Sequence, residues 1–225
     1  MAFSSEQARR VRAGALVAFA VLVVGVAAAV LSGAFGSSTA PSERPLAGEA
    51  DAGARPAGDS DHDLDDIDAT YEPLVHQLQA KLDADPGDPA ALLGLANGYF
   101  DWGMAAMGHA VDDAGRAHVE EVFEAAVQRY DAYLEGNSSK PAVVDRAICL
   151  FYAGDHDAAT EALEAFVESD ASFAPAWANL GMFYESDGDS KPAADAYRRA
   201  IEAAGEDDAY GVRDYARQRL DALDR

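Results

Sequence analysis

The sequence predicts an all-α domain of repeated helical hairpins that follows one membrane-spanning helix. Apolar side chains recur at intervals of three and four residues through most of segment 64–225, which is the period of an amphipathic helix. A pattern of large and small apolar residues at Lys140 returns 34 residues later at Ala174, as in a helical repeat. The segment 13–31 is uncharged and long enough as a helix to cross a bilayer.

The N-terminal part predicts a single-pass anchor. Residues 1–12 hold three arginines, and the next basic residue after segment 13–31 is Arg44. The positive-inside rule therefore places residues 1–12 in the cytoplasm and the rest of the chain outside it, on a cell membrane. A cleaved signal peptide is the alternative, because Ser32-Gly33-Ala34 offers small residues at the spacing of a cleavage site.

The next two segments differ sharply in composition. Residues 32–63 are rich in Gly, Pro, Ala, Ser and Asp without an apolar period, which predicts a disordered acidic linker. Residues 64–84 place apolar side chains on one helical face, and Asp85-Pro86-Gly87 ends that helix. Asp88 then predicts an N-cap for a following helix with Pro89 in its first turn.

The segment 64–225 divides into repeats. We predict units at about 89–139, 140–173 and 174–207, with a capping helix at 208–225. The first unit is 17 residues longer than the 34-residue period, and the extra residues are assigned to an insertion at 104–119, with the second helix resuming at about Glu120.

The last unit carries a specific motif. It matches the tetratricopeptide-repeat (TPR) pattern at seven positions: Trp177, Leu180, Gly181, Tyr184, Ala193, Tyr197 and Ala200. The chain thus resembles the TPR family, which implies a helix-turn-helix solenoid of about three repeats plus flanking helices. The second unit departs from the pattern at Arg146, where leucine is usual.

The resemblance also implies a binding groove, because TPR proteins bind partners on the inner face of their first helices. Carried over by position, the partner-binding residues are Leu93, Asn97, Phe100, Val144, Ile148, Phe151, Tyr152 and Met182. Such an apolar strip suits an amphipathic or apolar polypeptide segment, and Ile148→Glu is expected to abolish its capture. The alternative is that the C-terminal helix or the insertion covers these side chains and makes them core.

Several other functions are excluded or disfavoured. A net charge of −23 disfavours nucleic acid as a partner. The sequence contains no HExxH pair, phosphate-binding loop or nucleophile elbow, so we predict no enzyme, catalytic residue, cofactor, metal or small-molecule substrate. His109 and His118 with Asp112 and Asp113 form the only metal candidate, and a solvated loop explains them better. Cys149 is interpreted as a buried small apolar residue.

The predicted function is a membrane-tethered scaffold that binds protein or peptide partners outside the cytoplasm. This architecture is similar to that of TPR accessory proteins in cytochrome c maturation and nitrite reductase assembly, which implies a role in cytochrome c maturation or envelope protein assembly. Two alternatives stay open: an ancillary, chaperone-like subunit of the secretion translocon, and a structural envelope tether.

Overall fold

The described part of the chain is entirely helical. The computed structural model describes residues 63–206 and 208–225, and within them it contains eight α-helices and no strand. The helices are α2 (Leu64–Ala84), α3 (Pro89–Met107), α4 (Asp113–Leu134), α5 (Lys140–Tyr152), α6 (His156–Ser169), α7 (Ala174–Ser186), α8 (Ser190–Ala203) and α9 (Val212–Leu223). The prediction of an all-α, TPR-like solenoid is confirmed for this region.

Local sequence signals set the helix starts and turns. Five helices have an N-cap whose side chain accepts a hydrogen bond from a backbone N–H of the first turn: Asp63, Asp88, Asp112, Ser139 and Asp155. A proline stands in the first turn of α3, α5 and α7, where its missing N–H is not needed. Gly154 and Gly188 make the turns within the second and third repeats with φ of 90° and 86°, a conformation that side-chain-bearing residues rarely adopt.

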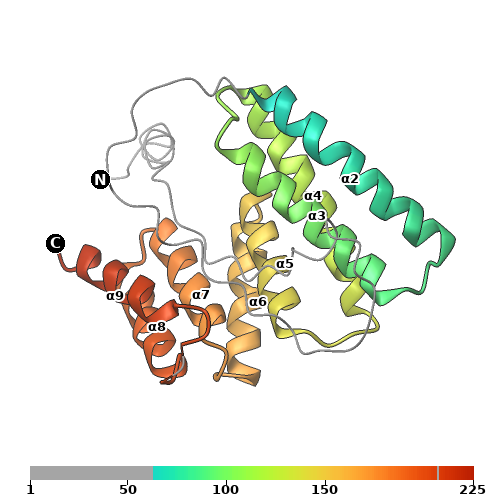
Figure 1. Cartoon of the computed structure of the whole chain (residues 1–225). Coiled ribbons are helices and arrows are strands. Elements are labelled where there is room, and N and C mark those ends of the chain that lie inside the picture. Colours follow the sequence, from blue (N-terminus) through green and yellow to red (C-terminus); the bar gives the residue numbers. More distant parts are fainter. Residues whose placement is uncertain (1–62, 207) are drawn as a thin grey trace.

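The helices pack in chain order. Each helix contacts the next one along the chain, and the array runs from α2 at one end to α8 and α9 at the other (Figure 1). The first helices of successive repeats also touch, since α5 contacts both α3 and α7, and α7 contacts α9. This pairwise stacking is the arrangement expected when no single hairpin can bury its own apolar face.

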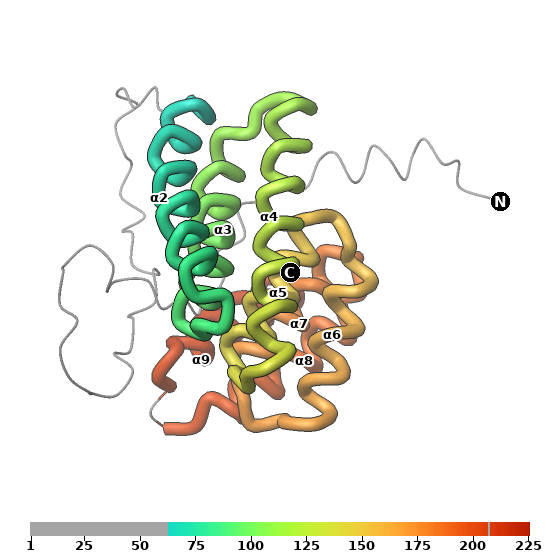
Figure 2. Tube along the Cα trace, turned by 90° about the vertical axis from the view of Figure 1, so that its right-hand side faces the viewer, coloured from blue at the N-terminus to red at the C-terminus, as the bar shows by residue number. Residues whose placement is uncertain are grey.

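The extra length of the first repeat lies mostly within its helices. We expected the second helix of this repeat to resume at about Glu120, but α4 begins at Asp113, and only residues 108–112 separate it from α3. As a result α3 and α4 have 19 and 22 residues, against 13 and 14 for α5 and α6. The long helices α2, α3 and α4 extend side by side beyond the shorter ones (Figure 2).

The apolar core of the described residues consists of two neighbouring clusters, one that runs from α2 to α7 and one formed by α7, α8 and α9. Its largest fully buried side chains are aromatic and come from four helices: Phe100, Phe123, Tyr130, Phe183 and Tyr197. Arg146, the departure from the repeat pattern, does not interrupt this core. Its Nε donates a hydrogen bond to the Asp131 carboxylate of α4, so the side chain links α5 to α4 at the surface.

The predicted anchor 13–31 lies outside the described residues, as do residues 1–12 and all of the linker 32–63 except Asp63. Within residues 63–206 and 208–225, no helix combines the length and the apolar character that crossing a bilayer requires.

Candidate binding face on the first helices

Most of the predicted groove residues are buried. Phe100, Val144, Ile148, Phe151 and Met182 expose between 0 and 8% of their surface. They belong to one core cluster that runs through the helices from α2 to α7. A partner therefore cannot contact these five side chains in this structure.

Contacts between neighbouring repeats account for this burial. The ring of Phe151 on α5 stacks on that of Phe183 on α7, with centroids 4.5 Å apart and planes within 5°. Tyr152 stacks on Phe123 of α4 at 5.3 Å, and Phe123 meets the ring of Phe100 edge-on at 6.4 Å. Aromatic pairs in these geometries stabilise the interface between repeats, so the side chains serve packing between the repeats.

Three of the predicted groove residues, Leu93, Asn97 and Tyr152, are partly exposed. Asn97 is also tied into the fold, because its Oδ1 accepts a hydrogen bond of 2.7 Å from the Tyr130 hydroxyl on α4. Two further inner-face positions of the same pattern, Ala90 at the start of α3 and Ser186 at the end of α7, are exposed. We call these five residues the accessible inner positions.

The C-terminal helix closes one end of the inner face. Arg219 of α9 donates two hydrogen bonds to the Glu185 carboxylate of α7, one of them 3.1 Å long. The Tyr197 hydroxyl of α8 donates to the same carboxylate at 2.9 Å. Glu185, an inner-face residue by its position in the repeat, is therefore neutralised within the chain and is not available to bind a cationic partner.

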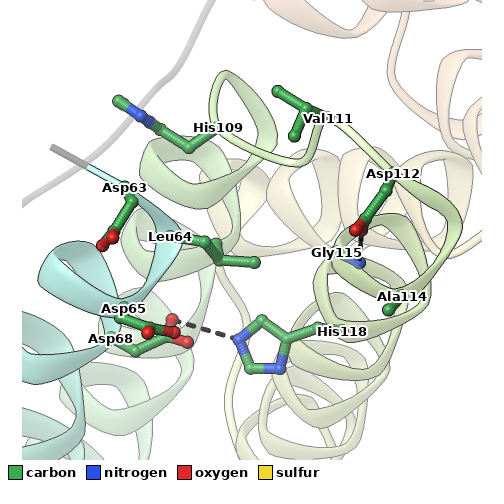
Figure 3. A pocket seen from close by; sticks show the side chains of 10 residues that line it. All are labelled: Asp63, Leu64, Asp65, Asp68, His109, Val111, Asp112, Ala114, Gly115 and His118. Atoms are coloured by element: carbon green, nitrogen blue, oxygen red, sulfur yellow. Dashed lines mark hydrogen bonds and ion pairs between the residues drawn. The ribbon is translucent and has the colours of Figure 1, made fainter. Parts of the chain in front are cut away.

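The histidine cluster lies at the other end of the array. A hollow of about 430 Å³ lies between the start of α2, the loop after α3 and the start of α4. Figure 3 shows the side chains that line it. Three of its four carboxylates have structural roles: Asp63 and Asp112 cap α2 and α4, and Asp68 accepts a hydrogen bond from Trp102 Nε1 at 2.7 Å. His118 Nε2 lies 3.1 Å from Asp68 Oδ1, so this histidine is a helix residue joining α4 to α2.

The metal candidate is not assembled in the structure. Asp113 pairs with Arg116 on the surface of α4, and His109 lies at the rim of the hollow (Figure 3). Among the residues that the structure describes, no three His, Cys, Asp or Glu side chains are grouped to hold a metal ion.

Sequence reasoning missed one buried acid. Asp145 of α5 is 4% exposed, and its Oδ1 has no hydrogen-bond partner. Burial, and secondarily the charge of Asp101, raises the pKa of the Asp145 carboxyl well above its usual range. Burial likewise raises the pKa of the Cys149 thiol and of the Tyr130 phenol. The sequence carried a signal for this buried acid, because Asn179, 34 residues after Asp145, is a polar residue at the same repeat position.

Comparisons with known proteins agree with this architecture at the level of the repeat. Residues 174–207 match the family model described as tetratricopeptide repeat, which spans α7 and α8. Among 14 matching chains of solved structures is one titled "Crystal structure of MamA". It shares 22% sequence identity at a TM-score of 0.47, over 72% of this chain and 92% of that chain. No curated protein matches the chain.

Proposed function

We propose that this chain, with a tetratricopeptide repeat at 174–207, is a non-enzymatic scaffold that binds a polypeptide segment along the face of α3, α5 and α7. The fold is typical of non-enzymatic interaction proteins. The observation that carries the proposal is the unbroken succession of first helices, in which α5 touches α3 and α7. Such a succession offers one extended surface to a linear partner.

The accessible inner positions indicate what this surface can recognise. Leu93 and Tyr152 offer apolar contact area, and Ser186 offers a polar hydroxyl group. The inner-face positions include no lysine or arginine, so a free carboxyl terminus is a poor ligand for them. A net charge of −23 favours basic or neutral partners.

We also propose that the scaffold is tethered to a cell membrane and faces away from the cytoplasm. This part rests on the sequence of residues 1–31, in which three arginines precede an uncharged segment of spanning length. A role in cytochrome c maturation or envelope protein assembly rests on the resemblance of the architecture alone, and it is the role that the partner's identity tests.

The experiment is site-specific photo-crosslinking of the full-length protein in native membranes. A photoreactive amino acid replaces Ala90 on α3 or Ser186 on α7, both exposed inner positions. The matched controls carry it at Ala132 on α4 and Ala165 on α6, exposed positions on second helices. We expect the same polypeptide to be captured from Ala90 and Ser186 and not from the two controls.

Mass spectrometry of the crosslinked partner then separates the roles. Apocytochrome or haem-lyase peptides support the maturation role, whereas translocon subunits or this chain alone contradict it in favour of the two alternatives. Capture only from Ala132 or Ala165 would overturn the binding face itself. Ile148→Glu is not a suitable test, because Ile148 is fully buried and the substitution is expected to unfold the repeat.

A further inference from the structure

Asp145 is a buried acid in the middle of α5 without a compensating charge. It exposes 4% of its surface, and its Oδ1 lacks a hydrogen-bond partner. The neighbouring cation does not neutralise Asp145, because the Arg146 guanidinium pairs with Asp131. An ionised carboxylate held in this way costs several kcal/mol.

The repeat supplies a polar counterpart for this position. Asn179 of α7 lies one 34-residue repeat after Asp145 and is also buried, at 2% exposure. Its Nδ2 donates a hydrogen bond of 2.9 Å to the backbone oxygen of Pro175, four residues earlier. Pro141 stands four residues before Asp145, so the same acceptor is present in α5. Only a protonated carboxyl could make the equivalent bond.

The titratable groups around Asp145 also favour its neutral form. Asp101 on α3 acts on it as a like charge, and Tyr130 on α4 and Cys149 on α5 are themselves buried acids. The Tyr130 hydroxyl donates its hydrogen bond to Asn97 Oδ1, at 2.7 Å, and not to Asp145. Arg146 is the basic group on α5 near this cluster, and its Nε is engaged by Asp131.

We propose that Asp145 is a neutral carboxylic acid in the folded domain, that it donates a hydrogen bond to the Pro141 carbonyl as Asn179 does to Pro175, and that its ionisation loosens the packing of α5 on α4. The packing of the second repeat on the long hairpin of α3 and α4 then depends on Asp145 staying protonated. A rise in pH withdraws that proton and places a charge among apolar side chains.

The direction of the pH effect follows from linkage. Because burial raises the folded-state pKa of Asp145 above the unfolded value, its stabilising effect is complete below pH 4 and is lost as the pH rises through the folded pKa. The Asp145→Asn variant keeps a donor and a neutral side chain at every pH, so it lacks this dependence.

The first experiment compares denaturation of the full-length wild-type chain and Asp145→Asn between pH 4 and pH 9. We expect the two chains to have equal denaturation midpoints near pH 4. Above that pH, the midpoint of Asp145→Asn should exceed that of the wild type by an amount that grows with pH. Glu161→Gln, which neutralises an exposed carboxylate on α6, is the matched control and is expected to show no such growing difference. A variant less stable than the wild type at neutral pH would overturn the proposal.

The second experiment does not depend on the variant's stability. In the full-length chain with ¹³C-labelled aspartate, the Asp145 carboxyl signal is expected at the protonated chemical shift at pH 7. The backbone amide protons of α4 and α5 near Asp145 are expected to lose hydrogen-exchange protection as that signal titrates. An Asp145 carboxyl that titrates near pH 4 would contradict the proposal directly.

Discussion

Gly181 and Tyr197 show how one absent side chain positions two helices. A Cβ built on Gly181 of α7 would lie 2.7 Å from the ring carbons of Tyr197 on α8, closer than real side chains approach. The ring cannot easily move, because Tyr197 is fully buried and its hydroxyl is bound to Glu185. The glycine of the repeat motif is therefore required by the close approach of the ring.

Gly181→Ala is predicted to destabilise the domain by about 1–3 kcal/mol, the usual cost of overpacking a filled core. Thermal unfolding of the full-length chain measures this loss. Gly108→Ala is the matched control, since a Cβ there meets no atom within 4 Å, and it should leave stability nearly unchanged. Equal stability of the two variants would show that the ring of Tyr197 can move aside.

Burial of the groove residues was the part that the sequence alone could not decide. The repeat pattern gives the position of Phe151 and Met182 along their helices, but their exposure depends on how closely the next repeat stacks. That distance is set by contacts such as the Phe151–Phe183 stack, between residues far apart in sequence. Leu93, on α3 in the first repeat, keeps part of its surface exposed.

At the scale of elements, a single carboxylate joins three helices. Asp68 Oδ1 of α2 accepts a hydrogen bond of 2.7 Å from Trp102 Nε1 of α3. The same oxygen lies 3.1 Å from His118 Nε2 of α4. All three side chains are at least partly shielded from solvent, where a lost bond costs more than at the surface. The start of α2 is thus held by polar contacts in addition to its apolar face.

We predict that Asp68→Ala destabilises the domain by about 1–3 kcal/mol, because it leaves the Trp102 indole N–H without its acceptor. Hydrogen exchange should speed up first in the N-terminal half of α2 and the start of α4. Glu72→Ala, an exposed substitution on the same helix, serves as the control. Unchanged exchange at α2 in Asp68→Ala would contradict the role given to this carboxylate.

Helix boundaries followed from the sequence where capping signals were clear. The Asp88-Pro89 pair predicts the start of α3, and the 34-residue register relates Gly154 to Gly188 in the two turns. The early start of α4 was missed, although Asp112 caps it through Gly115 N–H at 2.8 Å. The segment around it mixes Gly, Asp and small residues, so its short-range pattern resembles a loop. The packing of α4 on α3 and the contact of His118 with Asp68 of α2 favour the longer helix.

On the scale of the whole molecule, the reactivity of the Cys149 thiol measures how often the core opens. Cys149 is fully buried in the cluster that runs from α2 to α7. Burial raises the pKa of the Cys149 thiol well above its usual range, which further suppresses the reactive thiolate. Its modification therefore requires the repeats to separate.

We predict that Cys149 in the native full-length chain reacts with a thiol reagent at least a thousandfold more slowly than in denaturant, as expected for a group exposed only by large-scale opening. The rate is measured by absorbance of the released reagent group. An Ala165→Cys variant supplies an exposed thiol on α6 for comparison and should react at once. Fast native labelling of Cys149 would mean that the junction of α4 and α5 opens by itself.

The pairing of Glu185 with Arg219 bears on self-assembly. In an endless array, the helix after α8 would be the first helix of another repeat, and here α9 takes that place with a cation that satisfies the carboxylate of α7. A second molecule that extended the solenoid from this end would have to displace α9. The partly shielded carboxylate of Glu185 would then lose its pairing with Arg219. The Arg219–Glu185 pair thus opposes end-to-end growth of the solenoid at α9.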